Sequence, residues 1–373
     1  MDLFGRAGNA GRPGAVRPVT PVPSASPIRA SVLIVNYNGG PKLVECLDSV
    51  FATLPEDCEV IVVDNASSDG SPDDVAARFP RATLVRSPEN RGYGSGNNLG
   101  AARARGRQLV FLNPDTVVEP AWLEALLEPL EREGQVGLTT SRILLADRSD
   151  RINTCGNDVH VTGLALCRGM GESLDTFSAT EEVGAVSGAA FAARADVFRA
   201  LGGFDEDFFL YVEDTDLSWR ARLAGWKILY VPRSVVRHHY TFRVAPSKVF
   251  LQERNRYQML AKCLRWPTLL VLLPALLLAE AVTWGFVIVR DRANAAGKLR
   301  AYAWTIRGAG GLARKRRTTQ ATRRVRDRDL LLRTGYRLDF GQAAPGGVAQ
   351  AAKLVFDPLF FLFRGLALAL VWW

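Results

Sequence analysis

The segment EVIVVDNASSDG, residues 59–70, indicates the fold class of this chain most clearly. Its first half is an apolar, β-branched run, which is typical of a buried strand, and its second half has the polar and glycine residues of a turn. A helical pattern follows at Pro72–Phe79. A buried strand, a polar turn and a helix form the unit from which parallel sheets are built.

The same unit recurs on both sides of this segment. We predict strands at Ser31–Asn36, Glu59–Asp64, Ala82–Arg86 and Gln108–Leu112, and further helices at Lys42–Thr53, Ser95–Arg105 and Trp122–Glu133. Because the strands are almost continuously apolar, the expected fold is α/β, with a mainly parallel sheet covered on both faces. Sheets of this kind bind ligands beyond the carboxyl ends of their strands.

A second block, about Val183–His239, mixes strand-like runs with one clear helix. The helix is predicted at Asp214–Leu223, with an ion pair between Asp216 and Arg220 four residues apart. Lys227–Val231 is predicted to be a strand that Pro232 closes.

The C-terminal part contains two long apolar stretches, Trp266–Val289 and Leu354–Trp373. The first is long enough to span a bilayer, but Pro274 and Glu280 interrupt it. A single crossing and a re-entrant or interfacial hairpin remain open, and the positive-inside rule favours the hairpin. A third hypothesis is that both stretches are core helices of a soluble protein. The terminal Val-Trp-Trp argues against it, because Trp favours the membrane interface.

Charge is concentrated between these two stretches. The chain has a net charge of +9, and residues 290–333 contain fourteen Lys or Arg against three Asp, which leaves the remainder slightly acidic. A basic segment beside apolar stretches and with few interleaved aromatics favours anionic membrane lipid over nucleic acid as a partner, although a merely solvated loop is the simpler alternative.

The N-terminal residues and the cysteines indicate the cellular compartment in which the protein is expected. Residues 1–28 are rich in Pro, Gly, Ala and Arg without an apolar core, so we expect a disordered arm and no signal peptide. The five cysteines have no paired short spacing, which fits a reducing compartment. The expected location is therefore the cytoplasmic face of a membrane.

Polar residues gather where the predicted strands end. Asp115 follows a buried strand within Asn113-Pro114-Asp115, where a carboxylate could take a divalent cation, although the same three residues also suit an ordinary turn. The loop Asn90–Asn98 is rich in glycine and could approach a phosphate, but it lacks a dinucleotide fingerprint.

Two further clusters come later in the chain. Glu213 and Asp214 begin the predicted helix after an aromatic run, where partial burial could tune a general base; an N-cap role is the alternative for Asp214. His238 and His239 are two of only three histidines, and a metal role and a structural role are about equally plausible for them.

The order of these motifs resembles family 2 glycosyltransferases, in particular the bacterial rhamnosyltransferase-like branch. The resemblance covers about Ser31 to Arg256 and rests on the motifs above together with Gly202-Gly203-Phe204-Asp205-Glu206 and Tyr211–Arg220. It implies a GT-A fold, a nucleoside-diphosphate sugar donor, Mg²⁺ or Mn²⁺, and inversion at the anomeric carbon. A catalytic domain over 29–256 and a helical, membrane-associated region over 257–373 complete the expected organisation.

The resemblance also implies roles for individual residues. Asp214 matches the base, with Glu213 as the alternative; Asp115 matches the surviving carboxylate of a metal-binding Asp-x-Asp whose first position is Asn113 here. His238 or His239 would complete the metal site, and Gly203, Phe204 and Asp205 would lie near the acceptor. The nucleotide-sugar pocket would be formed by Asn36, Asn38, Asp64, Asn65, Asn90, Gly92, Asn97 and Asn113.

The expected activity is transfer of a sugar, with rhamnose favoured, to a glycan or polyprenyl-linked acceptor in cell-wall and surface polysaccharide biosynthesis. A galactofuranosyl or mannosyl donor, or a non-catalytic membrane-bound scaffold of the same fold, remains the alternative.

Overall fold

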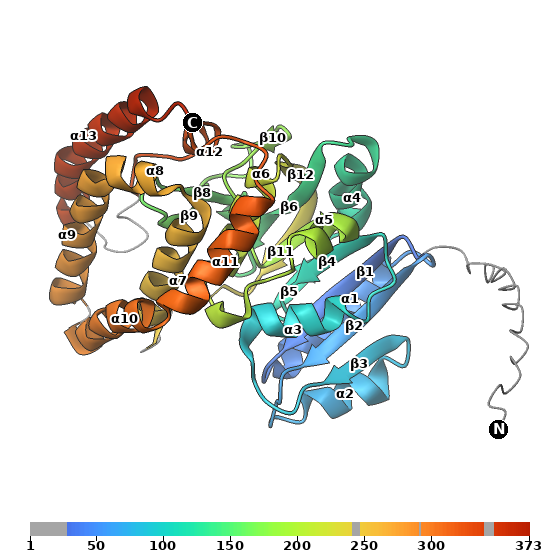
Figure 1. Ribbon diagram of the computed structural model, residues 1–373. Helices are drawn as coiled ribbons and strands as arrows, with labels where there is room; N and C mark the ends of the chain where they lie inside the picture. Colours follow the sequence, from blue (N-terminus) through green and yellow to red (C-terminus); the bar gives the residue numbers. More distant parts are fainter. Residues whose placement is uncertain (1–27, 241–246, 291, 339–346) are drawn as a thin grey trace, which may run out of the picture.

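The computed structural model describes residues 28–240, 247–290, 292–338 and 347–373 (Figure 1). All but the last residue of the predicted disordered arm lies outside this part. The centre of the molecule is a ten-stranded sheet in the order β10-β12-β6-β11-β4-β1-β2-β3, with β5 paired to β12 and β7 paired to β6. A separate two-stranded sheet joins β8 (Asn157–Val159) to β9 (Ala165–Cys167).

The N-terminal half of the sheet is parallel, as predicted. It comprises β1 (Ala30–Asn36), β2 (Cys58–Asp64), β3 (Ala82–Arg86) and β4 (Gln108–Leu112). The intervening helices are α1 (Gly40–Thr53), α2 (Ser71–Arg78) and α3 (Gly92–Ala101), and α4 (Trp122–Arg132) follows β4. The glycine-rich loop is therefore largely helical, since α3 begins three residues before the predicted start.

Apolar residues on both faces of these strands explain the two hydrophobic layers. One layer packs the sheet against α1, α2 and α4, with Leu43 and Leu126 fully buried in it. The other packs the opposite face against α3, α5 (Ala195–Ala200) and α6 (Glu213–Leu223), where Phe198 and Leu217 are buried.

The remaining strands make the sheet mixed, not mainly parallel. β11 (Ala190–Arg194) runs antiparallel to both β4 and β6 (Val136–Leu145), and β12 (Lys227–His238) runs parallel to β6. The short edge strands β5 (Thr116–Val118), β7 (Arg148–Thr154) and β10 (Glu181–Glu182) are antiparallel to their neighbours.

The prediction that Pro232 closes a strand is wrong. β12 continues to His238, and its register with β6 shifts between Val231 and Val235. Proline lacks the N–H that a regular ladder requires, and an irregularity in the pairing accommodates it. This continuation carries His238 to the position opposite Thr116 of β5, beside the end of β4.

Helices form the rest of the chain. They are α7 (Lys248–Cys263), α8 (Trp266–Val271), α9 (Leu273–Arg290), α10 (Ala295–Arg307), α11 (Ala309–Ala321), α12 (Asp327–Leu332) and α13 (Gly347–Leu370). The predicted domain boundary at residue 256 falls inside α7, which contacts α6, α8, α10 and α11. Within the described residues, no helix combines the length and the apolar content that crossing a bilayer requires.

Candidate active site

The carboxyl ends of the parallel strands bring the predicted polar residues to one edge of the sheet. Asn36 pairs in register with Asp64 across β1 and β2, and Ile34 of β1 pairs with Leu112, the last residue of β4. Asn113 and Asp115 follow β4 directly. Three of the predicted motifs therefore end at the same edge.

Asn36 organises this edge from inside. It is fully buried; its Nδ2 donates to Ser67 Oγ at 3.0 Å and to Ser71 Oγ at 2.8 Å, and its Oδ1 accepts from the Gly39 amide. Asn38 is exposed, and its Oδ1 accepts from the Ser68 amide at 2.8 Å. Asn36 thus shapes the loops at this edge, whereas Asn38 is exposed on the surface there.

The loops after β2 and β3 are joined by side-chain amides. Asn65 Nδ2 donates to Asn90 Oδ1 at 2.9 Å and to the Gly92 carbonyl at 3.1 Å, and Asp64 Oδ1 accepts from the Ser67 amide. Asn97, one turn into α3, is buried and donates to the Tyr93 carbonyl. Asp64, Asn65, Asn90, Gly92 and Asn97 thus belong to connected loops, whereas Asn113 is hydrogen-bonded to Ala189 instead.

Gly92 is required by a close approach of two loops. It has a positive φ of 82°, and a Cβ at this position would lie only 2.1 Å from the Phe209 carbonyl oxygen. The next residue, Tyr93, donates its amide to the same carbonyl at 2.8 Å and its hydroxyl to the Gly188 carbonyl at 2.7 Å. The start of α3 is thereby attached to the loops beside α6.

Asp115 and His238 face one another. His238 Nε2 lies 3.2 Å from Asp115 Oδ1, and His238 Nδ1 lies 2.9 Å from Asn153 Oδ1. Since an amide oxygen only accepts, Nδ1 carries a proton. Nε2 then either carries a second proton, which it donates to Asp115, or presents a lone pair. Two acceptors at this separation need a proton or a cation between them. A carboxylate and an imidazole also suit Mn²⁺ chemically.

The neighbouring histidine points elsewhere. His239 Nε2 lies 3.1 Å from Glu45 Oε2, while its backbone amide donates to the Asp115 carbonyl. Adjacent residues of an extended chain point in opposite directions, which explains the difference. Within the described part of the chain, no three His, Cys, Asp or Glu side chains are grouped as metal ligands. A cation here would therefore need oxygen ligands from substrate or water, as divalent cations at phosphate sites commonly have.

The pKa of Asp115 reflects this arrangement. Burial disfavours its charged form, but the hydrogen bond and the charge of His238 outweigh burial and hold the pKa below its usual value. The carboxylate is therefore ionised at neutral pH and available to a cation.

Asp214 and Glu213 begin α6 in different surroundings. Asp214 Oδ2 accepts from the Gly188 amide at 2.9 Å and from Asn157 Nδ2 at 3.2 Å, and Oδ1 accepts from the Thr215 amide and hydroxyl. Glu213 Oε2 is buried without a hydrogen-bond partner in the described structure. Burial, and then the charge of Asp214, raises the pKa of Glu213 to about 8; burial also raises the pKa of Asp214, against its hydrogen bonds.

A short turn links Asp214 to the edge of the sheet that holds Asp115. The Gly188 amide holds the Asp214 carboxylate, and the carbonyl of the next residue, Ala189, accepts from the Asn113 amide at 2.9 Å. Asp115 is two residues beyond Asn113. The carboxylate pair required for the predicted chemistry therefore shares one edge of the sheet.

Comparisons with known proteins agree with this geometry. Residues 31–201 match glycosyl transferase family 2. This segment is a family 2 glycosyltransferase segment. It is similar to the N-acetylglucosaminyl-diphospho-decaprenol L-rhamnosyltransferase of Mycobacterium tuberculosis, with 29% identity over 62% of this chain and 83% of that protein. It is also similar to the succinoglycan biosynthesis protein ExoO of Rhizobium meliloti, with 35% identity over 27% of this chain and 30% of the relative.

Solved structures support the GT-A-like fold. GalNAc-T7 with UDP, GalNAc and Mn²⁺ aligns with a TM-score of 0.53 and 19% identity, over 64% of this chain and 48% of that one. TarS residues 1–349 from S. aureus, in complex with UDP, aligns with a TM-score of 0.51 and 15% identity, over 91% of this chain and 90% of that one. The fold of this glycosyltransferase is thus shared beyond the segment that matches the family.

The predicted acceptor-side residues serve the interior in this glycosyltransferase. Phe204 is buried in an aromatic cluster with Tyr93 and Phe111, and the Gly203 carbonyl accepts from Arg220, which also pairs with Asp216 as predicted. Asp205 Oδ2 lies 2.6 Å from Lys262 Nζ. Their side chains or carbonyls are therefore engaged within the protein, and their position near the acceptor stays a prediction.

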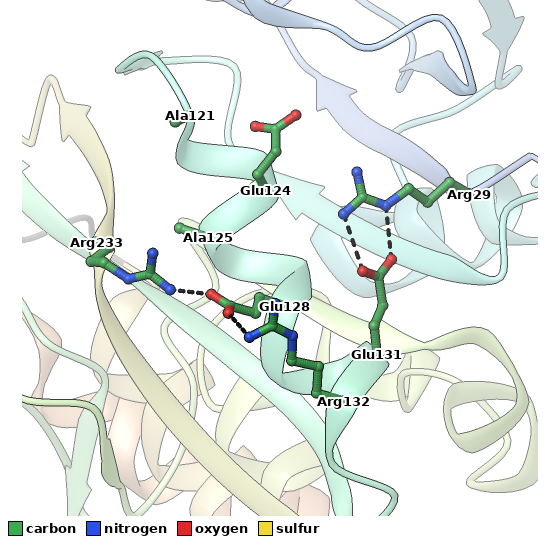
Figure 2. Close-up of a pocket in the computed structure, with 8 residues that line it drawn as sticks. All are labelled: Arg29, Ala121, Glu124, Ala125, Glu128, Glu131, Arg132 and Arg233. Atoms are coloured by element: carbon green, nitrogen blue, oxygen red, sulfur yellow. Dashed lines mark hydrogen bonds and ion pairs between the residues drawn. The ribbon is translucent and has the colours of Figure 1, made fainter.

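A surface hollow of about 400 Å³ lies away from this edge (Figure 2). Its charges neutralise one another: Arg29 lies 2.8 Å from Glu131, and Glu128 accepts from both Arg132 and Arg233. Arg29 directly precedes β1, so the hollow borders the amino ends of the strands. Active sites of such sheets lie at the opposite ends, and we assign this hollow no part in catalysis.

Sequence reasoning missed several residues of the site, namely Tyr93, Asn153, Asn157 and Gly188. Tyr93 lies inside the glycine-rich motif and could have been found there. Asn153 and Asn157 belong to β7 and β8, short strands with no periodic pattern, so nothing in the sequence signals their contacts with His238 and Asp214.

Proposed function

We propose that the chain is an inverting glycosyltransferase that moves a sugar, with rhamnose favoured, from a nucleoside-diphosphate donor to a hydroxyl of a glycan or polyprenyl-linked acceptor. The observation that carries the proposal is the turn Gly188–Ala189, which joins the oriented carboxylate of Asp214 to the edge that holds Asp115 and His238. The acceptor class follows the relative from M. tuberculosis, whose name specifies a decaprenol-linked diphosphate.

Asp214 would be the general base. Four hydrogen bonds favour its ionised form, whereas Glu213 retains a proton near neutral pH. Asp214 would accept the proton of the attacking acceptor hydroxyl, and a single displacement inverts the anomeric carbon. The Asn65–Asn90–Gly92 group would position the donor nucleotide.

A divalent cation, Mg²⁺ or Mn²⁺, would supply charge stabilisation for the departing diphosphate. Asp115 and His238 would hold it, and Asn153 would keep the His238 ring in the ligating tautomer. His239 would take no direct part, because its ring faces Glu45.

We further propose that the enzyme attaches to the cytoplasmic surface of the membrane without spanning it. α9 and α13 contact each other at the side of the molecule away from β3 (Figure 1). They expose large apolar side chains, including Leu277, Leu354, Phe361 and Leu362, and Trp372 follows α13 with 72% of its surface exposed. α10, which contacts α9, exposes Arg300 and Arg307. An apolar face beside basic residues suits insertion into an anionic bilayer surface.

The decisive test is turnover with a panel of nucleoside-diphosphate sugars that includes rhamnosyl, galactofuranosyl and mannosyl donors. The purified full chain with Mn²⁺ should transfer one donor class to a polyprenyl-diphosphate glycan with inverted configuration. Absence of transfer from every donor would favour the non-catalytic scaffold, and preference for a different sugar would correct the donor.

Asp214→Asn should lower turnover by about two to four orders of magnitude, because it removes the proton acceptor and keeps the side-chain shape. Binding of the donor nucleotide, measured by calorimetry, should remain near that of the wild type. A near-normal rate in this variant would exclude Asp214 as the base and direct attention to Glu213.

A further inference from the structure

The segment that leads into α6 has an unusual backbone. Phe209, Tyr211 and Val212 have φ angles of 60°, 69° and 70°, in the left-handed region that residues with a side chain rarely adopt. Val212 is β-branched and directly precedes Glu213 and Asp214, so this conformation sets where α6 begins. Strained backbone of this kind persists only where surrounding contacts determine it.

Two buried side chains of α7 supply those contacts. Asn255 Nδ2 lies within hydrogen-bond distance of three carbonyls, those of Phe208 (2.9 Å), Leu210 (3.0 Å) and Tyr211 (2.7 Å). Arg254 Nη2 donates to the carbonyls of Asp207 (2.6 Å) and Phe208 (2.8 Å). Arg254 Nε also donates to Asn255 Oδ1, so the guanidinium and the amide act as one unit.

Both side chains are inaccessible to solvent, with 7% of Arg254 and none of Asn255 exposed. A buried amide and guanidinium require hydrogen-bond partners, and here the partners are almost all backbone carbonyls of one segment. On its other side, the same segment accepts from Tyr93 at the Phe209 carbonyl. Residues 207–212 are thus held between α3 and α7.

We propose that Arg254 and Asn255 are positioning residues for the catalytic base. By binding the carbonyls of residues 207–211, they hold Val212 in its left-handed conformation and place Asp214 against the Gly188 amide. Neither residue lies within residues 31–201, so the helical part of the chain would complete a site whose other residues precede it. This inference rests on the proposed role of Asp214.

The test compares Asn255→Ala with Gln258→Met in the full-length chain. Gln258 is a buried amide on the same helix, and its Nε2 has no hydrogen-bond partner in the described structure. Asn255→Ala should lower kcat by about 10- to 100-fold, with little change in the dissociation constant of the nucleoside diphosphate. Gln258→Met should keep kcat within about threefold of the wild type.

Hydrogen exchange provides a readout that does not depend on activity. The amides of residues 209–214 should exchange faster in Asn255→Ala than in the wild type or in Gln258→Met. Normal exchange and normal kcat in a folded Asn255→Ala variant would overturn the inference. Equal loss of nucleotide binding and kcat would also overturn it, because that result indicates a general structural role.

If Asn255→Ala does not fold, Arg254→Lys gives the same test, because it keeps the charge and removes the Nη2 donor. Faster exchange at residues 209–214 in a protein that turns over no donor would reject the proposed function and keep the positioning role. If the wild type is active and depends on Asp214, but exchange at residues 209–214 is unchanged in the variant, the positioning role is rejected and the proposed function is kept.

Discussion

Glu213 and Asp214 are adjacent in the chain, yet their surroundings separate them chemically. Asp214 has donors on both carboxylate oxygens, while Glu213 Oε2 has none in the described structure. Burial, and then the charge of Asp214, raises the pKa of Glu213 to about 8, whereas hydrogen bonds oppose the rise that burial causes in the pKa of Asp214. Enzymes use such differences in surroundings to divide roles between two acids.

Glu213 should make the folding stability depend on pH. Its pKa is higher in the folded state than in the unfolded state, so its contribution is present below about pH 4.5 and is lost as the pH rises through about 8. The Tm of the wild type should therefore fall, relative to that of Glu213→Gln, between pH 5 and pH 9. Parallel Tm curves for the two proteins would contradict the raised pKa.

The two histidines should separate in a metal-binding experiment. His238→Asn removes the nitrogen that faces Asp115, and we expect the Mn²⁺-dependent affinity for a nucleoside diphosphate to fall by about tenfold or more. His239→Asn is the matched control and should bind as the wild type does. Calorimetry with and without Mn²⁺ measures both, and equal losses would reject the assignment to His238.

For single residues, the sequence predicts which residue types lie at the site better than it predicts what each one contacts. Asp115, His238 and Asp214 meet at one edge, as the motif order implies. Asp205 belongs to the same motif set, yet it is engaged by Lys262, which lies 57 positions along the chain. No local pattern can reveal such a partner, because the pairing depends on how α7 packs.

Among the elements, α9 is attached to α7 and α10 through a buried charge network. Glu280, which interrupts the apolar stretch, accepts from Arg256 of α7 at 2.5 Å and lies 2.9 Å from Lys298 of α10. Burial alone would raise the pKa of Glu280, but Arg256 and its other partners hold it at about 2. The charge that argues against a membrane span therefore has a partner inside the protein.

Glu280→Ala should destabilise the fold strongly. It leaves the fully buried Lys298 with one carboxylate fewer, and breaking a buried pair costs about 3–5 kcal/mol. Asp73→Ala is the control, because Asp73 pairs with Arg86 on the surface, where solvent screening leaves such a pair little effect on stability. Denaturant unfolding followed by circular dichroism measures both, and similar losses would contradict the network's importance.

The elements that sequence predicts well are the ones with regular patterns. β3 and β4 have the predicted bounds, and β1 and β2 differ by one residue, because each is a short apolar run bounded by polar turns. β12 was predicted seven residues too short, since a proline normally ends a strand. The irregular pairing with β6 that tolerates Pro232 is a tertiary feature without a sequence signal.

At the scale of the whole molecule, much of the basic segment binds the protein itself. Lys315 pairs with Asp205 and Asp207, Arg323 with Asp327, and Arg333 with Glu182. The net charge of this segment therefore overstates the number of basic side chains that are available to bind anionic lipid. The exposed arginines of α10 and α11 and the apolar face of α9 and α13 remain for that purpose.

Vesicle binding tests the membrane proposal. The full chain should sediment more strongly with vesicles that contain anionic lipid than with neutral vesicles. Leu354→Asp combined with Leu362→Asp should weaken binding by at least about tenfold, because both side chains are exposed and apolar. Ala77→Asp, on the exposed face of α2, is the control; unchanged binding by the double variant would reject this face.

The continuity of α7 across residue 256 has a practical consequence for anyone who shortens the polypeptide. A fragment that stops there retains every position matched to the family, but it cuts the helix one residue after Asn255. Helix ends fray, so Arg254 and Asn255, which bind the segment before α6, would lie in the frayed last turn of the shortened α7. Such a fragment should have low solubility. A fragment that extends through α11 keeps α7 together with α10 and α11, against which it packs.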